Sequence, residues 1–245
     1  MKNKIPLVKL FFLIGLIFSF STVYSQTATP PATGDGSESN PYQIATLDNL
    51  YWLSQDTTVW DDYFIQTEDI NASATSEWNS GLGFDMIGND SVAFKGNYNG
   101  QSFTINGLVI NRPNESYVAF FKKTVNGTIV KNLGLTNFTI TGLERVGGLF
   151  TNCLAEVSNC YTTGTITANQ EGKSVVGGFA AGCYGTISNS FSNVNVIAAD
   201  GDLIGGFVGT FGSDGVITNS YSLGSVNGNK YVGGFLGTIG SGASV

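Results

Sequence analysis

The sequence contains no histidine, and only 12% of its residues are charged. Without histidine, a Ser-His-Asp triad, a histidine general base and a histidine-ligated metal are all excluded. The HExxH zinc signature is absent for the same reason, and no glycine-rich stretch has the GxxxxGK[ST] spacing of a phosphate-binding loop. These absences exclude the corresponding hydrolase, metalloprotease and nucleotide-binding sites from these 245 residues.

Basic residues are also scarce. Eleven Lys and Arg stand against eighteen Asp and Glu, which gives a formal net charge of −7. An acidic chain without a basic cluster argues against nucleic acid or an anionic membrane as partner. Residues 146–245 hold only seven charged side chains. Backbone pairing and packing must hold that half together, because so few ion pairs can form.

Long apolar runs are missing as well. The longest, Leu10 to Phe20, has eleven residues and follows three lysines. A membrane-spanning helix needs about 20 residues, whereas a short apolar run after basic residues is typical of a secretory signal peptide. The small residue Ser25 predicts cleavage before Gln26. We therefore predict a signal peptide at 1–25, a secreted or cell-surface location, and no membrane insertion of the mature chain.

The mature chain repeats itself from Tyr117 onward. A valine or isoleucine recurs at intervals of 28, 30, 28 and 28 residues, and a second element such as TISNSFS or VITNSYS keeps the same step. Periods of 20 to 50 residues indicate solenoids or related arrays, and short β-branched runs between Gly, Asn and Asp indicate strands. The sequence predicts an all-β fold, namely a right-handed parallel β-helix (β-solenoid).

Stacked coils would align equivalent residues in rows about 4.8 Å apart. Leu149 and Phe121 would then extend an apolar row of phenylalanines, and asparagines would form a hydrogen-bonded ladder. Paired glycines would lie where a side chain collides or the backbone bends. We predict that the following residues are architectural: Gly147, Gly148, Gly177, Gly178, Gly205, Gly206, Gly233, Gly234, Phe179, Phe207, Phe235, Asn159, Asn189 and Asn219.

The three cysteines are an odd number for an exported chain. Cys153 and Cys183 each lie seven residues after the recurring valine, so stacking would place them one strand spacing apart, within disulfide range. A Cys153–Cys183 disulfide and two buried thiols both remain open. Cys160 is expected in the core.

The part before the repeats has a different organisation. Residues 26–36 are predicted to form a flexible leader, and 37–116 a cap with the first coils. Thr46 is a predicted N-cap of a helix at about 46–55, which would cover the first coil. Residues 117–245 hold the repeats, and the last copy lacks its second element, which predicts truncation at the C-terminus.

Two stretches, Gly206-Phe207-Val208-Gly209 and Gly234-Phe235-Leu236-Gly237, match the Gly-Leu-any-Gly core of the GLUG motif. The copies at 148–151 and 178–181 depart from it. The chain thus resembles the GLUG-motif repeat proteins, which are exported bacterial proteins that include adhesins, and the likeness covers about residues 34–245. The resemblance implies a β-solenoid and a surface location. It implies no catalytic residue.

The acids and tryptophans are the remaining candidates for function. A β-helical polysaccharide lyase or hydrolase needs aligned carboxylates with a basic residue, and the acids of the repeats do not share one position. Tryptophans, if exposed, could stack on sugars. We expect instead that Trp52 packs the helix onto the end of the coil and that the other two are partly buried. We predict a non-catalytic, adhesin-like scaffold that binds glycan or protein and needs no cofactor. The alternative is a β-helical polysaccharide lyase or hydrolase. A Ca²⁺ site is considered at the acidic cluster Asp61, Asp62, Glu68 and Asp69. The acids of the repeats, expected to be solvated turn or isolated residues, are Asp200, Asp202, Asp214, Glu156 and Glu171. The tryptophans are Trp52, Trp60 and Trp78.

Overall fold

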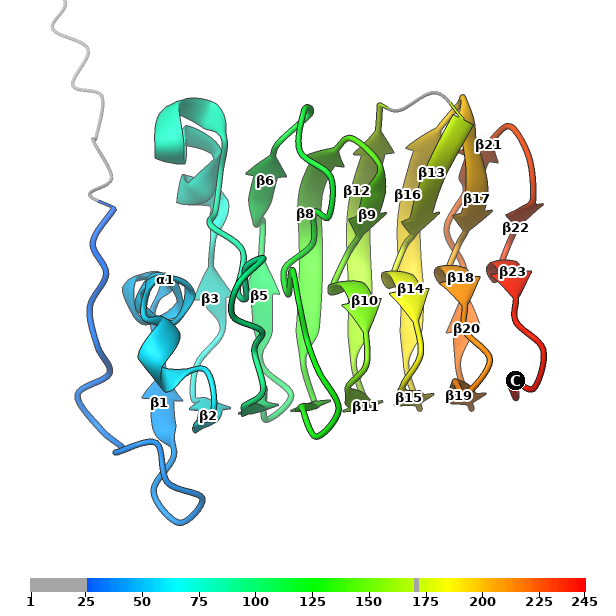
Figure 1. Ribbon diagram of the computed structural model, residues 1–245. Helices are drawn as coiled ribbons and strands as arrows, with labels where there is room; N and C mark the ends of the chain where they lie inside the picture. Colours follow the sequence, from blue (N-terminus) through cyan, green and yellow to red (C-terminus); the bar gives the residue numbers. More distant parts are fainter. Residues whose placement is uncertain (1–25, 170–171) are drawn as a thin grey trace, which may run out of the picture.

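The computed structural model of the protein describes residues 26–169 and 172–245, so the predicted signal peptide lies outside the described residues. The described chain winds into a β-solenoid of about six turns, with its N-terminal end beside helix α1 and its C-terminal end at the opposite pole (Figure 1). The predicted all-β solenoid is confirmed. No helix among the described residues has the length and apolar character needed to cross a membrane.

Four parallel sheets run along the solenoid. Every ladder between named strands is parallel, as expected when each coil lies on the one before it. The first sheet contains β1 (Tyr42–Ile44), β2 (Tyr63–Gln66), β4 (Asn97–Asn99), β7 (Ile129–Lys131), β11 (Glu156–Ser158), β15 (Thr186–Ser188) and β19 (Val216–Thr218). The second contains β3 (Ile70–Asn71), β5 (Thr104–Asn106), β6 (Val109–Asn111), β8 (Gly134–Gly142), β12 (Tyr161–Ala168), β16 (Phe191–Ala198), β20 (Tyr221–Ser222) and β21 (Val226–Gly228).

The third and fourth sheets belong to the C-terminal coils. The third contains β9 (Arg145–Gly147), β13 (Gly172–Gly177), β17 (Gly201–Gly205) and β22 (Val232–Gly233). The fourth contains β10 (Phe150–Cys153), β14 (Ala180–Cys183), β18 (Val208–Phe211) and β23 (Leu236–Ile239). Parallel pairing also continues across residue 116, from β4 to β7 and from β5 to β8. One solenoid therefore includes both the cap region and the repeats.

Aromatic rings fill the centre of the coils. Phe207 stacks on Phe179 at 4.7 Å between ring centroids and on Phe235 at 5.0 Å. Leu149 takes the predicted place in the stacked coils, because its backbone N–H donates to the Phe179 carbonyl oxygen as that of Phe179 does to Phe207. The row of rings, however, continues from Phe179 to Phe150 at 6.1 Å and then to Phe121 at 5.4 Å. Phe121 is the bridge partner of Phe150, since the segment from Val146 to Phe150 is one residue longer than the segment from Val118 to Phe121.

An asparagine ladder lies on the surface at the corner after the first sheet. Asn132, Asn159, Asn189 and Asn219 all have φ between 49° and 54°, the left-handed region in which Asn is better tolerated than most residues. The Asn159 amide donates to Asn132 Oδ1 at 3.0 Å, and the Asn219 amide donates to Asn189 Oδ1 at 3.2 Å. The same residue type therefore suits both the turn and the bond along the stack.

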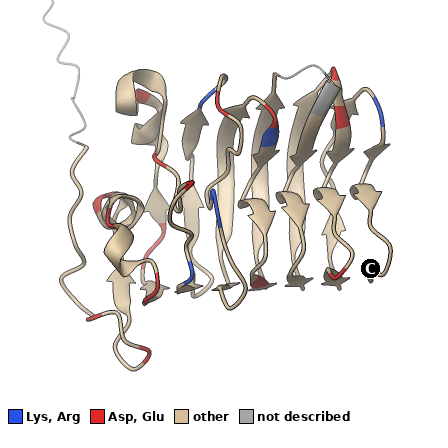
Figure 2. Ribbon diagram, in the orientation of Figure 1, with Lys and Arg blue, Asp and Glu red and all other residues tan. Residues whose placement is uncertain are grey.

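Helix α1 (Leu47–Gln55) closes the N-terminal end of the solenoid. Thr46 is its N-cap, with a capping box to Asn49, as the sequence predicted. Leu50 and Leu53 are fully buried on the first coil. Two 3-10 helices, η1 (Thr57–Val59) and η2 (Ser73–Gly81), were not predicted, because neither stretch has helical apolar periodicity. Charged side chains are concentrated in loops and in this N-terminal part (Figure 2).

Candidate functional site

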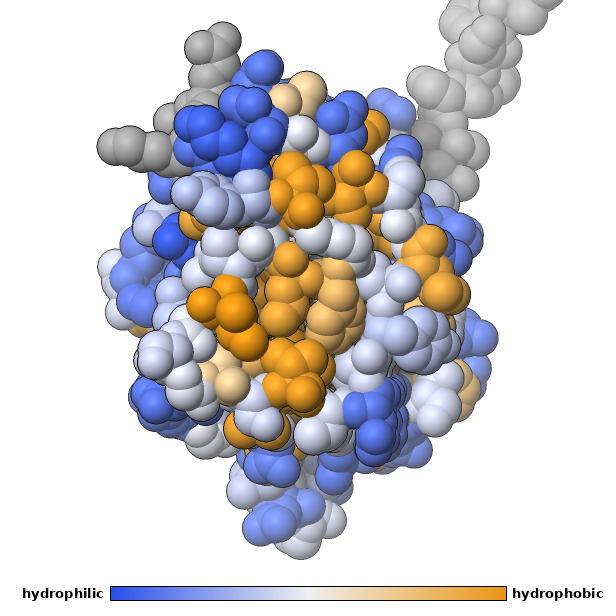
Figure 3. Space-filling model, turned by 90° about the vertical axis from the view of Figure 1, so that its right-hand side faces the viewer, coloured by the Kyte–Doolittle hydropathy of each residue, from blue (hydrophilic) through white to orange (hydrophobic). Residues whose placement is uncertain are grey.

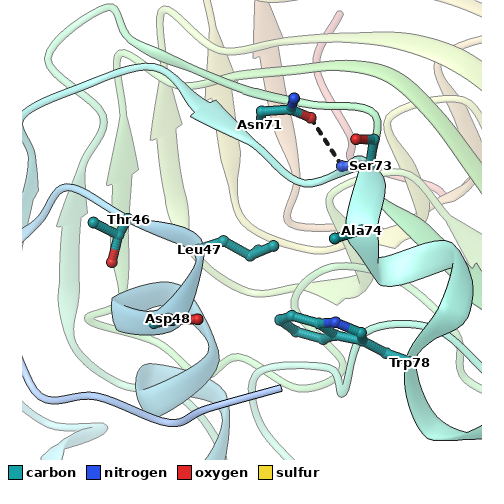
Figure 4. Close-up of a pocket in the computed structure, with 7 residues that line it drawn as sticks. All are labelled: Thr46, Leu47, Asp48, Asn71, Ser73, Ala74 and Trp78. Carbon is teal, nitrogen blue, oxygen red and sulfur yellow. Dashed lines mark hydrogen bonds between the residues drawn. The ribbon is translucent and has the colours of Figure 1, made fainter. Parts of the chain in front are cut away.

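A hollow of about 360 Å³ lies between helix α1 and η2 at the capped end (Figure 4). Two hydrogen-bonded helix starts position the residues that line it. Thr46 starts α1, which fixes the first turn beside the hollow, and Asn71 Oδ1 accepts a hydrogen bond from the Ser73 backbone N–H at 3.0 Å, which starts η2. The lining residues, called the cap hollow below, are Thr46, Leu47, Asp48, Asn71, Ser73, Ala74 and Trp78.

Several polar groups of the cap hollow have no hydrogen-bond partner among the described residues. Figure 4 shows the Asp48 carboxylate and the Ser73 hydroxyl directed into the space. Asn71 uses its oxygen for Ser73, which leaves its NH₂ group available. The Thr46 hydroxyl is already engaged, since it accepts from the Asn49 N–H at 3.1 Å. The hollow therefore offers one carboxylate acceptor, one hydroxyl and one amide donor.

Trp78 adds a fourth group. Its side chain packs against Tyr51 at 5.0 Å between ring centroids and is only 3% exposed, yet the indole Nε1 has no acceptor in the described structure. The edge that carries this nitrogen faces Leu47 and Ala74 across the hollow (Figure 4). A buried N–H without an acceptor costs about 1–3 kcal/mol. In contrast, Trp60 Nε1 donates to the Leu53 carbonyl oxygen at 2.6 Å.

The tryptophans are buried, as expected, and offer no exposed ring face for stacking on sugars. Trp52, Trp60 and Trp78 are all buried, because each packs against the cap helix or its surroundings. Trp78 lines the cap hollow, but its indole nitrogen is covered by neighbouring side chains. The sequence analysis did not predict that three further residues line the hollow, namely Asp48, Asn71 and Ser73. Their local patterns carry no specific signal, because an acid after an N-cap and an Asn-x-Ser turn both occur at many helix starts.

A second hollow, of about 380 Å³, lies beside Tyr117. Its cations already have partners. Lys122 pairs with Asp90 at 3.0 Å, and the Lys123 ammonium donates to the Asp90 carbonyl oxygen at 2.9 Å. Arg145 lies 5.8 Å from the centroid of the Tyr117 ring. This hollow therefore offers fewer unpaired hydrogen-bonding groups than the cap hollow.

The isolated acids of the repeats lie in different sheets and turns. Glu156 begins β11 in the first sheet, whereas Asp202 lies in β17 of the third and pairs with Lys230 at 3.6 Å. Asp200 and Asp214 lie in turns between strands. The structure does not bring Glu156, Asp200, Asp202 and Asp214 together into one row, and Glu171 lies outside the described residues.

The acids upstream are engaged by other residues. Asp61 pairs with Lys95 at 3.2 Å, and Asp69 accepts from the Thr104 backbone N–H at 2.7 Å. Burial away from water, together with the charges of Asp61 and Asp56, raises the pKa of Asp62. Within residues 26–169 and 172–245, no group of three or more acidic, cysteine or histidine side chains is placed to hold a metal ion. Calcium binding at these acids remains a prediction.

The cysteines lie as the repeat suggests, in the core. Cys153 and Cys183 are direct partners in the register of β10 and β14, and all three cysteines are free thiols. The disulfide left open by the sequence is thus not formed in this structure. Hydrogen bonding with Cys183, and then burial, raises the pKa of Cys153, and burial raises the pKa of Cys160 to about 12.

We expect the folded protein to react slowly with a thiol reagent at neutral pH, because the thiols are buried and the raised pKa values keep Cys153 and Cys160 protonated. After unfolding in denaturant, titration with an aromatic disulfide reagent should count three thiols per chain. A count of one would show that Cys153 and Cys183 are joined.

Two curated proteins are similar to part of the chain. No protein-family model matches it. Halomucin of Haloquadratum walsbyi is 32% identical over 168 residues, which are 66% of this chain and 2% of halomucin. An Evansella cellulosilytica protein named "Putative Gly-rich membrane protein" is 31% identical over 148 residues, 56% of this chain and 16% of that protein. The chain therefore spans only a small part of these relatives.

A solved structure shares the fold. The crystal structure described as a putative immunoglobulin A1 protease from Bacteroides ovatus superposes with a TM-score of 0.67 and 24% identity. The match covers 87% of this chain and 66% of that one. This likeness supports the β-solenoid architecture and carries no information about activity.

Proposed function

We propose that the protein is an exported, non-catalytic surface module that binds a neutral glycan in the cap hollow. One observation carries the proposal: polar side chains of Asp48, Asn71 and Ser73 line a single hollow, and the buried indole N–H of Trp78 beside them has no acceptor among the described residues. Polar groups left unpaired at a concave site are the usual means of fixing a small ligand's orientation. The rigid solenoid behind them would present this end to a partner.

The chemistry of the four groups fits sugar hydroxyls. A hydroxyl both donates and accepts, so it can donate to the Asp48 carboxylate and accept from the Asn71 amide. The Trp78 N–H can only donate, and it would take a hydroxyl or ring oxygen once the side chains that cover it shift. A carboxylate in a chain of net charge −7 disfavours anionic sugars. The ligand class is therefore a neutral saccharide.

The surface location rests on several supports. The predicted signal peptide directs export, and one relative is named a membrane protein. We further propose that the chain is a GLUG-motif repeat protein, on the strength of Gly206-Phe207-Val208-Gly209 and its copy at 234–237. In that case the repeats form the scaffold, and binding is confined to the cap.

The test is a pair of matched tryptophan variants. In calorimetric titrations with neutral oligosaccharides, Trp78→Phe should weaken binding about 5–30-fold, because it removes one hydrogen bond of about 1–2 kcal/mol. Both Trp78→Phe and Trp60→Phe remove buried ring volume and should lower the free energy of unfolding. The loss should be larger for Trp60→Phe, because that change also removes the hydrogen bond to the Leu53 carbonyl oxygen, and its affinity should stay unchanged.

Two results would contradict the proposal. Equal affinities for the wild type and Trp78→Phe would place the binding elsewhere. Depolymerisation of a polysaccharide by the purified protein, measured with and without Ca²⁺, would show the lyase or hydrolase alternative instead.

A further inference from the structure

The exposed surface of the described chain is uneven in composition. Figure 3 looks onto the end that carries the last coil, where hydrophobic side chains occupy the centre. Basic side chains gather elsewhere. Eight Lys and Arg follow residue 25, and Lys122 and Lys123 line the second hollow, which Arg145 adjoins. This hollow, called the basic hollow below, is lined by Asp90, Tyr117, Lys122, Lys123 and Asn152, among others.

Two neighbouring coils bring these side chains together. Their bridge pairing sets Tyr117 beside Arg145 and Lys123 beside Asn152, since the residues next to or two before them in the chain are bridge partners. The Arg145 guanidinium donates to Asn152 Oδ1 at 3.2 Å and lies 5.8 Å from the centroid of the Tyr117 ring. Both contacts hold the guanidinium at the hollow, and they leave most of its five N–H donors for a ligand.

Positive charge is in excess at the basic hollow. Its lining holds two lysines and one acid, Asp90, and Arg145 adds a third positive charge, in a chain whose formal net charge is −7. Lys122 pairs with Asp90, but that carboxylate is 85% exposed, and exposed ion pairs are weak. Glu144, which precedes Arg145, accepts a hydrogen bond from the Ser116 hydroxyl at 3.3 Å. The hollow therefore favours an anion, unlike the cap hollow with its carboxylate.

Tyr117 supplies an aromatic surface beside the cations. Its side chain is 40% exposed, and its φ of 63° lies in the left-handed region, which is uncommon for a bulky residue. Strained backbone positions of this kind cluster at ligand-binding sites. An exposed tyrosine ring can pack against the apolar face of a sugar while a cation next to it binds a carboxylate.

The backbone at the basic hollow is paired on both sides. Phe121 bridges Ile87 in one neighbouring coil and Phe150 in the other, so a peptide cannot add there as a further strand. A ligand held by side chains alone is favoured. We infer that the basic hollow binds an acidic saccharide, with its carboxylate at Lys123 and Arg145 and a sugar ring against Tyr117.

Calorimetric titration of the full chain with a galacturonate trisaccharide at low ionic strength tests this inference. The wild type should bind it saturably, and Lys123→Gln should weaken binding about 5-fold by removing one exposed positive charge. Asp90→Asn should act in the opposite direction and strengthen binding about 2–5-fold, because it removes the carboxylate that competes with the ligand. Both side chains are exposed, so both variants should fold as the wild type does.

Lys131→Gln is the matched control. It removes the same charge from an exposed position on β7, in the first sheet, and should leave the affinity within about twofold. Absence of saturable binding, equal weakening by the two lysine variants, weaker binding by Asp90→Asn, or tighter binding of an acidic peptide of equal charge would overturn the inference.

The basic hollow and the cap hollow can be tested separately, because they share no lining residue. Trp78→Phe should leave galacturonate binding unchanged, and Lys123→Gln should leave the binding of neutral oligosaccharides unchanged. Weaker galacturonate binding by Trp78→Phe would place this ligand in the cap hollow and overturn the inference.

Discussion

Gly206→Ala is expected to lower the free energy of unfolding by about 3 kcal/mol or more. A Cβ at this position would overlap the backbone carbonyl oxygen of Gly234 in the next coil, and it would lie 2.6 Å from the Ser222 hydroxyl oxygen. Backbone cannot move aside as a flexible side chain can, so the two coils would have to separate locally. Urea denaturation followed by circular dichroism measures the loss.

Gly234→Ala is the control for this prediction. Gly234 occupies the same place in the last copy of the motif, but a Cβ there meets no atom within 4 Å. We expect a change below about 1 kcal/mol, of either sign. Equal losses for the two variants would mean that Gly206 is needed for the shape of its own turn and not for the coil stacked on it.

Phe207→Ala should be the most damaging single truncation, with a loss of about 3–5 kcal/mol. Phe207 is fully buried, and its ring lies between those of Phe179 and Phe235 at 4.7 and 5.0 Å. Removing the ring leaves a cavity in the centre of the stack, which the rigid sheets cannot close. The same urea denaturation reports the effect.

Phe235→Ala provides the comparison. Phe235 stacks on one ring only and is partly exposed, so its truncation should cost less than half as much. A larger loss for Phe235 than for Phe207 would contradict the view that a ring enclosed between two others contributes most to stability.

The fold could be predicted because every coil must bury the same apolar face against its neighbours. A coil cannot bury its own apolar face, so valines, phenylalanines and glycines recur at one interval, and that interval sets the register. The Phe179, Phe207 and Phe235 positions followed directly from it. Leu149 follows the same register, but the ring that continues the row is that of Phe150, because the segment from Val146 to Phe150 is one residue longer than the segment from Val118 to Phe121. The sequence pattern alone did not predict which of the two side chains continues the row of rings.

The cap hollow could not be predicted in this way. Asp48, Asn71 and Trp78 belong to segments that occur once, so no repeat reports their relative positions. Their meeting depends on how α1 and η2 pack on the first coils. The burial of Trp78 was expected from the sequence, but the missing acceptor of its indole N–H depends on the same packing and could not be predicted.

The most direct test of glycan binding uses the indole N–H signals in a ¹⁵N-labelled sample. The sequence has three tryptophans, so the spectrum should contain three such signals. On titration with a neutral oligosaccharide, the Trp78 signal should move or broaden, while the hydrogen-bonded Trp60 signal stays in place. Saturating binding that leaves the Trp78 signal unmoved would contradict the account.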